Sequence, residues 1–580
     1  MNGKEQPLGF KNLFVPLTTQ KIIVFIIITG FIVFFNNLFN NFVWDDKAYI
    51  LQNPLVHSIN IPAIFGRNGF NNNTQYRPLH ALYFSVLYAV VAAAPFFYHI
   101  LQLSLHIVNT LLVFFLLKHF LKRDLSLFLS FIFLVHPLQV ESVSFIGSSV
   151  NPLFFLSGMI ALLLSLPAKI NNKRLAGICT FLLISILLKE TAILFFFVIL
   201  LYRIIFHKNF IKTFAFGSLI TLGIYYLLRI TEIGGQYSQS VLSLIAGLPL
   251  LQRLINIPAV IFYYLKNFLC PMNLAVDQMW TVKSIDFSHF YFPLVIDCIF
   301  FLIIIFLGIY ILKKTKKMFS AYLFFSLWFL AGLTMHSQLI PLDMTVADRW
   351  FYFPIVGLLG IVGIGAKSFS SFTDRKIKIA GYILAIIIIM LFSLRTIARN
   401  KDWTDSITLF NHDSKITKSY DLENNLGTEY LNSKNYSEAL AHYKKSVALF
   451  PNDINTYDLA ATYTLTGNTT LAKQYYLKSF SMNHYIPQLR ETIYVNLAIT
   501  LAYYEKPTPA NADFIKKGVQ DYPNEVRLWS ALAYSEYELH DYVNALAAAK
   551  KVKALVSSKQ ADYLYTQIIT NQPIDVKLLR

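Results

Sequence analysis

Residues 22–38 read IIVFIIITGFIVFFNNL, and Trp44-Asp45-Asp46 follows shortly after them. A helical run of this length reaches across the hydrocarbon core of a bilayer, at about 1.5 Å per residue. Two adjacent carboxylates therefore lie where a first membrane helix leaves the lipid. An ionised group at such a boundary is costly unless it is hydrated, paired or functional. A solvated helix end explains most isolated Asp pairs, so the rest of the chain has to decide between a helix end and a functional site.

The composition is that of a membrane protein. Hydrophobic residues make up 55% of the 580 residues, and the mean hydropathy of +0.50 exceeds that of ordinary soluble proteins. Apolar segments of near 20 residues recur as far as about Thr396, after which the sequence turns polar. We predict an all-α chain in which a polytopic membrane domain at 1–400 is followed by a linker at 401–420. The chain then continues with a helical domain at 421–556 and ends with a C-terminal helix or tail at 557–580.

The formal net charge of +18 follows the membrane topology. The basic residues lie in short loops between apolar runs, which is the positive-inside pattern, and they do not gather in one polar region as in a nucleic-acid-binding protein. The first apolar run has a basic lead and no small-residue cleavage site, so we predict a retained signal anchor with a cytoplasmic N-terminus. Three cysteines give neither a disulfide framework nor a metal-ligand spacing.

The basic loops predict eleven spans and an external C-terminal domain. The apolar piece at 254–269 is preferred as an outer, non-crossing helix, because Lys313, Lys314, Lys316 and Lys317 have to lie inside; a crossing helix paired with a second hidden span is the alternative. The predicted spans cover residues 22–38, 98–117, 125–135, 153–166, 175–188, 191–206, 213–229, 291–312, 319–335, 350–366 and 379–395.

Residues 421–556 repeat with a period of about 34 residues. Leu426, Gly427, Tyr430, Ala439 and Tyr443 have the spacing of the tetratricopeptide pattern, and about four copies follow one another. Small residues at these positions let paired helices approach, and the aromatic residues fill the gaps between units. A stacked helical core explains these residues fully. A binding function would lie on the concave surface, which the sequence does not resolve.

Polar residues that interrupt the apolar pattern collect on the outer face of this topology, where they predict an aqueous site with both acids and bases. Each alone is more often an ion pair or a helix end. Together, carboxylates could deprotonate a hydroxyl acceptor, and an arginine could bind a phosphate in bidentate fashion. Arg77 is our first choice for the phosphate and Arg349 the second. The candidate residues are Asp45, Asp46, Tyr76, Arg77, His136, Glu141, Lys189, Glu190, His336, Asp348 and Arg349.

The ordered motifs resemble a known family. They are Trp44-Asp45-Asp46, Tyr76-Arg77-Pro78-Leu79, His106-x-x-Asn109, His136-Pro137-x-x-x-Glu141, Lys189-Glu190 and Asp348-Arg349-Trp350-Phe351-Tyr352. Together with the C-terminal repeats they are similar to the transmembrane and tetratricopeptide-repeat-containing O-mannosyltransferases of the GT-C glycosyltransferase superfamily. The family usually has Gly-Arg-Ala-Asp where this chain has residues 147–151, and Glu-Arg-Tyr where it has Asp348-Arg349-Trp350. The sequence therefore leaves the sugar and the acceptor open.

The resemblance implies a GT-C fold, a lipid-phosphate sugar donor and inverting transfer to a protein hydroxyl, with the repeats on the donor side. It implies that Asp45 and Asp46 are catalytic and favours Asp45 as the base, although the sequence leaves open which of the two acts. Tyr76, Arg77, His136, Glu141, Lys189, Glu190, Asp348 and Arg349 are expected to bind substrate. No cofactor is expected, and a divalent metal is possible but not indicated.

The function predicted from the sequence is transfer of a mannose-like hexose from a polyprenyl phosphate to a hydroxyl acceptor, chiefly protein Ser or Thr. The expected partners are the lipid-linked sugar, membrane lipid and an acceptor protein or glycan engaged by the repeats, without nucleic acid. Transfer to a lipid or surface glycan is an alternative, and so is a non-catalytic scaffold with partner-binding repeats. A transporter fits less well, because its ionisable residues would lie at mid-membrane. The expected location is a bacterial inner membrane with periplasmic repeats, or an endoplasmic reticulum membrane with luminal repeats in a eukaryote.

Overall fold

The computed structural model describes residues 18–66, 75–233, 243–369, 375–482 and 487–579. The chain divides into a membrane unit, residues 1–417, and a repeat unit, residues 418–580. Each is considered by itself below. The described residues are helical apart from loops and one isolated bridge between Gln278 and Val346.

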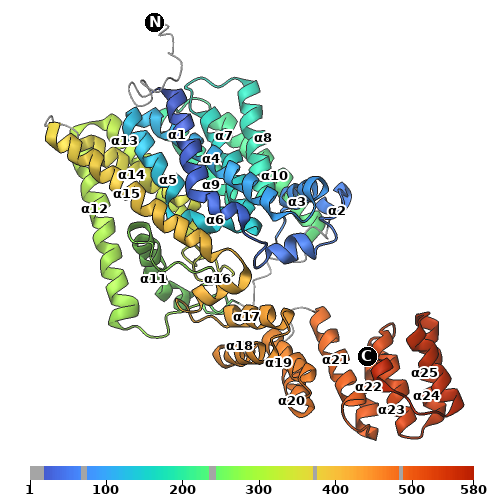
Figure 1. Cartoon of the computed structure of the whole chain (residues 1–580). Coiled ribbons are helices and arrows are strands. Elements are labelled where there is room, and N and C mark those ends of the chain that lie inside the picture. The colour runs from blue at the N-terminus through green and yellow to red at the C-terminus, as the bar shows by residue number, and fades with distance from the viewer. Residues whose placement is uncertain (1–17, 67–74, 234–242, 370–374, 483–486, 580) are drawn as a thin grey trace. The chain divides into compact units, whose positions relative to one another are not determined.

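The membrane unit is a bundle of long apolar helices joined by short ones (Figure 1). Its short 3-10 or π segments are η2 (Phe35–Phe39), η3 (Lys47–Leu51), η4 (Pro137–Gln139), η5 (Ile146–Ser149), η6 (Glu190–Ala192), η7 (Phe287–Tyr291) and η8 (Asp348–Tyr352). Its α-helices are α1 (Thr19–Phe34), α2 (Ile61–Phe65), α3 (Pro78–Val91), α4 (Pro95–Phe120), α5 (Arg123–Val135), α6 (Val140–Ser144), α7 (Val150–Ser165), α8 (Asn172–Leu188), α9 (Ile193–Phe206), α10 (Ile211–Ile233), α11 (Leu250–Leu269), α12 (Phe292–Lys314), α13 (Lys316–Met335), α14 (Pro354–Phe369), α15 (Arg375–Asp402) and α16 (Ser406–Asp413).

Each of the eleven predicted spans coincides with a helix, which confirms the all-α membrane fold. Within the described residues, seven helices are long and apolar enough to cross a bilayer, or eight if α5 and the segment after it, bent by 52°, form one span. The count is lower than eleven because α8, α9 and α14 have only 17, 14 and 16 residues. The helix α11, whose crossing the sequence left open, is not among the seven.

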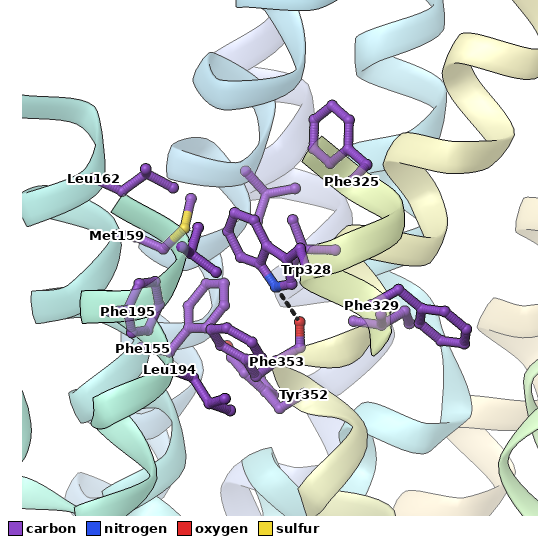
Figure 2. Packing of buried hydrophobic residues seen from close by; sticks show 14 of the residues in the cluster. Phe155, Met159, Leu162, Leu194, Phe195, Phe325, Trp328, Phe329, Tyr352 and Phe353 are labelled. Atoms are coloured by element: carbon purple, nitrogen blue, oxygen red, sulfur yellow. Dashed lines mark hydrogen bonds between the residues drawn. The ribbon is translucent and has the colours of Figure 1, made fainter. Parts of the chain in front are cut away.

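Aromatic side chains form the centre of the membrane unit (Figure 2). Trp328 of α13 is fully buried and donates its indole N–H to the Phe353 carbonyl oxygen at 3.1 Å. Phe195 of α9 lies edge-on to both Trp328 and Phe353. Its ring occupies the space that a Cβ at Gly158 of α7 would need. The glycine is therefore required for the close approach of α7 and α9.

The first and last helices of the bundle are joined by amide side chains. Asn36 donates to the Ile397 carbonyl oxygen at 3.0 Å, and Asn40 donates to the Asn400 carbonyl oxygen at 3.1 Å. Asn400 in turn donates to the Val33 carbonyl oxygen at 3.1 Å. These bonds satisfy polar groups at the end of α1 that lipid could not solvate.

The segment 401–420, expected to be a linker, is largely structured as part of the membrane unit. It contains α16, and Asp413 at the end of that helix accepts hydrogen bonds from Arg399 of α15 at 2.8 and 3.2 Å. The same carboxylate accepts from the Val276 backbone N–H at 2.7 Å. Both members of the ion pair are buried. The composition of this segment is polar, but its Asp413 forms a buried ion pair and hydrogen bonds within the membrane unit.

In its described residues, the repeat unit contains four helix pairs, a further helix and the short 3-10 segment η9 (Val576–Leu578). Its helices are α17 (Tyr420–Asn432), α18 (Tyr436–Leu449), α19 (Asp453–Leu465), α20 (Thr469–Phe480), α21 (Pro487–Tyr503), α22 (Pro509–Asp521), α23 (Val526–Glu538), α24 (Tyr542–Leu555) and α25 (Lys559–Thr570). The Tyr443 ring fills the space that a Cβ at Gly427 would need. Asn424 donates to Asp458, 34 residues later, at 3.0 Å, so that corresponding positions of adjacent repeats are bonded. This packing matches the predicted solenoid.

Candidate active site

The acidic pair lies in a strained loop after the first span. Trp44 has a positive φ of 52°, which is uncommon for a bulky residue and costs of order 1–3 kcal/mol. Its backbone N–H donates to the Ser406 hydroxyl at 3.3 Å, and its ring stacks on Phe145 at 5.0 Å between centroids. These contacts hold the backbone of the two aspartates that follow in a fixed conformation.

The two aspartates have different environments. Asp46 is fully buried, and its carboxylate accepts from the backbone N–H groups of Val43 at 3.0 Å and Gly147 at 2.6 Å. Burial raises the pKa of Asp46 to about 8, although these N–H groups act in the opposite direction. Asp45 is only half-buried, and its charge acts on Tyr49 and Arg349. Asp46 thus ties the loop to residues 146–149, and Asp45 is the carboxylate that a substrate can reach.

Arg77 and Glu190 form an ion pair at 2.9 Å at the start of α3. The Tyr76 backbone N–H donates to the other Glu190 oxygen at 3.2 Å, and Arg229 lies 3.7 Å from it. Although burial opposes ionisation, Arg77 holds the pKa of Glu190 below its ordinary value. The Tyr76 hydroxyl donates to the Phe65 carbonyl oxygen at 3.1 Å. The carboxylate therefore positions the guanidinium that we expect to bind phosphate.

Arg349 and Glu141 form a second ion pair. The guanidinium donates to one carboxylate oxygen of Glu141, and the Arg349 backbone N–H donates to the other at 2.9 Å. The Arg349 guanidinium also lies 5.6 Å from the centroid of the Trp44 ring, which places it beside the acidic pair. Residues that are 208 positions apart are thereby joined at one point.

Asp348, the residue before this arginine, has a different partner. It is buried and accepts from the Tyr263 hydroxyl of α11 at 2.6 Å. Burial, and then the nearby negative charge of Glu141, raise the pKa of Asp348 to about 8. The hydrogen bond between Tyr263 and Asp348 connects α11 to η8.

Lys189 is close enough to both arginines for their charges to act on it. It is only 7% exposed; its ammonium donates to Asn151 Oδ1 at 2.5 Å and lies 5.6 Å from the Phe154 ring centroid. Burial, and then the positive charges of Arg77 and Arg349, lower the pKa of Lys189 to about 7. Three cationic side chains from distant parts of the chain therefore lie close enough for their charges to interact, and the Asp45 charge acts on one of them, Arg349.

His136 is bonded through its ring nitrogens to the Phe268 carbonyl oxygen at 2.9 Å and to the Leu138 backbone N–H at 3.2 Å, and the ring stacks on Phe268. These contacts stabilise the chain at the C-terminal end of α5. His336, at the end of α13, stacks on Trp350 and bonds to the Gly332 carbonyl oxygen at 2.9 Å. Substrate binding by His136 stays a prediction, and the contacts described here are structural ones.

Three residues of the cluster were not singled out from the sequence. Tyr49 follows Asp45 by one helical turn, and its N–H donates to the Asp45 carbonyl oxygen at 2.8 Å. Asp343 is exposed, and its charge acts on Tyr49, Arg77 and Lys189. Asn151 was noticed only as part of a variant motif. The spacing from Asp45 could have suggested Tyr49, but Asp343 stands in a polar loop without any distinguishing pattern.

The donor set for a metal ion is not assembled here. Within the described ranges, no group of three or more His, Cys, Asp or Glu side chains could hold a metal. Two carboxylates of the cluster, Glu141 and Glu190, are each bonded to an arginine.

Comparison with known proteins bears out the resemblance seen in the motifs. The chain is 25% identical over 511 residues to human protein O-mannosyl-transferase TMTC3, covering 79% of this chain and 54% of the human protein. It is 24% identical over 469 residues to protein O-mannosyl-transferase F38B6.6 of Caenorhabditis elegans, covering 76% and 63% respectively. The chain is similar to the TMTC protein O-mannosyl-transferases. The tetratricopeptide repeat model matches residues 421–453, which include α18 and all but the first residue of α17.

The TMTC similarity includes most of this chain, but the chain spans about half the length of the curated relatives it matches first. Together with seven apolar helices of spanning length, the similarity indicates an integral membrane protein.

Proposed function

We propose that this chain is a membrane glycosyltransferase that moves a mannose-like hexose from a polyprenyl phosphate to a hydroxyl acceptor, chiefly the Ser or Thr of a protein. The observation that carries the proposal is a half-buried carboxylate, Asp45, whose charge acts on Arg349, in a cluster where Arg349 and Arg77 both act on Lys189. A base for a hydroxyl and a positive site for a phosphate are the two groups that such a transfer needs. The names of the similar proteins supply the sugar and the kind of acceptor.

In the proposed reaction Asp45 accepts the proton of the acceptor hydroxyl as its oxygen bonds to C1 of the sugar. The bond between C1 and the phosphate oxygen breaks, and the electron pair leaves with the polyprenyl phosphate. Attack opposite the leaving group inverts the configuration at C1. Asp46 does not touch the reacting atoms, because its two oxygens bond to the Val43 and Gly147 N–H groups. It is a positioning residue for Asp45.

The phosphate is proposed to lie among the three cations. Arg77 and Arg349 are each fixed by one carboxylate, which leaves other N–H donors of each guanidinium free to contact an anion in a defined orientation. Positive charge held in place before the reaction stabilises the negative charge that develops on the leaving phosphate. The side chains of Arg77 and Arg349 are only 19% and 12% exposed, so water and salt weaken their attraction to a phosphate less than they would at fully exposed groups.

The acceptor and the side of the membrane belong to the same proposal. The positions of the basic loops support a topology in which Asp45 and the C-terminus lie outside the cytoplasm, and the repeats at 418–580 would engage the acceptor there. The donor would then be a polyprenyl-phosphate sugar of the external leaflet, in a bacterial periplasm or an endoplasmic reticulum lumen. A topology reporter fused after Arg580 should be active only outside the cytoplasm; activity inside would refute this placement.

The proposed activity is tested with the purified full chain, a synthetic polyprenyl-phosphate mannose and a set of Ser- and Thr-containing peptides. Mass spectrometry should show addition of one hexose to a hydroxyl, dependent on Asp45. The matched control is Asp124→Asn, which replaces an exposed carboxylate in the first turn of α5. Transfer to lipid or glycan but not to peptide would favour the alternative acceptor. Absence of transfer to all three, with intact folding, would favour a scaffold.

A further inference from the structure

The cation Lys189 differs from the two arginines beside it. Arg77 is paired with Glu190 and Arg349 with Glu141. Among the residues that the structure describes, no carboxylate lies within ion-pair distance of the Lys189 ammonium. It has one amide oxygen, from Asn151, and one aromatic ring as partners. A buried ammonium without a counter-ion is unfavourable, because its desolvation is not offset by an opposite charge.

Asn151 is itself held in one orientation. Its amide N–H₂ donates to the Ser148 hydroxyl at 2.7 Å, which leaves the amide oxygen for Lys189. Ser148 follows Gly147, whose N–H donates to Asp46 at 2.6 Å. A single short segment therefore supports the acidic loop at one end and Lys189 at the other. An aspartate in place of Asn151 would have nearly the same shape and would neutralise the amine.

We propose that the phosphate of the lipid-linked donor is the counter-ion of Lys189, and that Asn151 orients this amine while leaving its charge for the donor. The inference rests on the proposed function, and it assigns to Asn151 a role in setting affinity for phosphate. The Asn151 amide makes the hydrogen bond that a carboxylate would make but does not compensate the charge. Because Asn151 is neutral, the positive charge of Lys189 stays available for an anionic ligand.

A consequence is that donor binding and protonation of Lys189 are linked. The groups whose charges act on Lys189 are Arg77, Arg349, Asp343 and Glu190, and Lys189 in turn acts on His80 and His336. Burial and the two arginines lower the pKa of Lys189 to about 7. An anion bound beside it raises that pKa again. Affinity for the donor should therefore be constant at low pH and fall by up to about tenfold per pH unit above pH 7.

The first test measures binding of a short-chain polyprenyl phosphate to the full chain in detergent. Lys189→Met should weaken binding at least about tenfold, while Lys189→Arg should retain more of it. Asn151→Asp supplies an internal counter-ion and should also weaken binding by about tenfold, with thermal melting unchanged or raised. The control is Lys313→Met, which removes an exposed lysine at the end of α12. Unchanged affinity in both Lys189→Met and Asn151→Asp would refute the inference.

The second test does not depend on transfer activity. Acetic anhydride modifies unprotonated amines, and mass spectrometry of the peptide that contains Lys189 reports its labelling as a function of pH. Saturating polyprenyl phosphate should shift the labelling midpoint upward by at least about one pH unit in wild type, and the shift should be absent in Asn151→Asp. If the lipid phosphate causes no shift, the inference is wrong even when transfer occurs. A shift in a protein that transfers no sugar would refute the proposed function and leave the phosphate site in place.

Discussion

Replacement of Asp45 by Asn is expected to abolish most transfer while leaving the fold intact. The Asp45 carboxylate is half-exposed, and its neighbour Asp46 makes the bonds that hold the loop. General-base assistance contributes about 10²- to 10⁴-fold to a rate, which corresponds to about 2.7–5.4 kcal/mol of transition-state stabilisation. We expect turnover of Asp45→Asn to fall by that factor, with little change in donor affinity.

Asp46→Asn is the informative comparison. An Asn at this position keeps one acceptor oxygen, so either the Val43 or the Gly147 N–H loses its partner. A buried donor left unsatisfied costs about 1–3 kcal/mol, so this variant should melt at a lower temperature than wild type. The turnover of Asp46→Asn should also fall, because the loop would no longer hold Asp45 in its position. The two variants thus separate a chemical role from a positioning role.

The assay is initial-rate transfer from a synthetic polyprenyl-phosphate mannose to a peptide acceptor, with thermal melting in the same detergent. Asp124→Asn controls for removal of an acidic residue at the surface. If Asp45→Asn turns over at a rate near that of wild type, Asp45 is not the base and the reasoning from exposure fails. If only Asp46→Asn is inactive and it melts normally, the roles of the two carboxylates are reversed.

The remaining predictions concern the phosphate site, pH and the end of the membrane unit. Arg77→Lys keeps the charge but loses the bidentate fork, so KM for the donor should rise about tenfold with kcat less affected, and an unchanged KM would exclude Arg77 from the site. The melting temperature of wild type minus that of Asp46→Asn should decrease as the pH is raised from about 4 to about 8. Burial raises the pKa of Asp46, so unfolding releases a proton over this range, and a flat difference would contradict the assignment. Asp413→Ala should destabilise the membrane unit by about 3–5 kcal/mol, because it leaves Arg399 buried without its main partner; a double change of Arg399 to Met and Asp413 to Leu should recover most of this loss in melting experiments.

Features with a local signal were predictable from the sequence. Each apolar run became a helix because its residues cannot remain in lipid without internal backbone bonds. The 34-residue repeat was visible because every copy has to bury the same face, as Gly427 and Tyr443 illustrate. The acidic pair was recognisable because carboxylates directly after a span are unusual. In each case the pattern that allowed the prediction lies within a few dozen residues of sequence.

Features that depend on distant pairing were not predictable. Lys189 and Asn151 are 38 residues apart, and Arg349 and Glu141 are 208 apart, so no spacing rule joins them. Asp343 is an exposed loop residue whose importance comes only from the cations around it. The helix α16 was not predicted because it lies in a polar segment. Its packing depends on the ion pair between Asp413 and Arg399, and Arg399 belongs to the domain predicted to end before this segment.

The bonds between α1 and α15 have a consequence for biosynthesis. The Asn36 amide finds its carbonyl partner 361 residues further along the chain. At about 5–20 residues per second, a ribosome needs on the order of 20–70 seconds to make that stretch. Throughout this interval the asparagines at the end of the first helix have entered the membrane without their final partners. The nascent protein therefore depends on water at the membrane surface, or on the insertion machinery, to hold these amides until the last helix arrives.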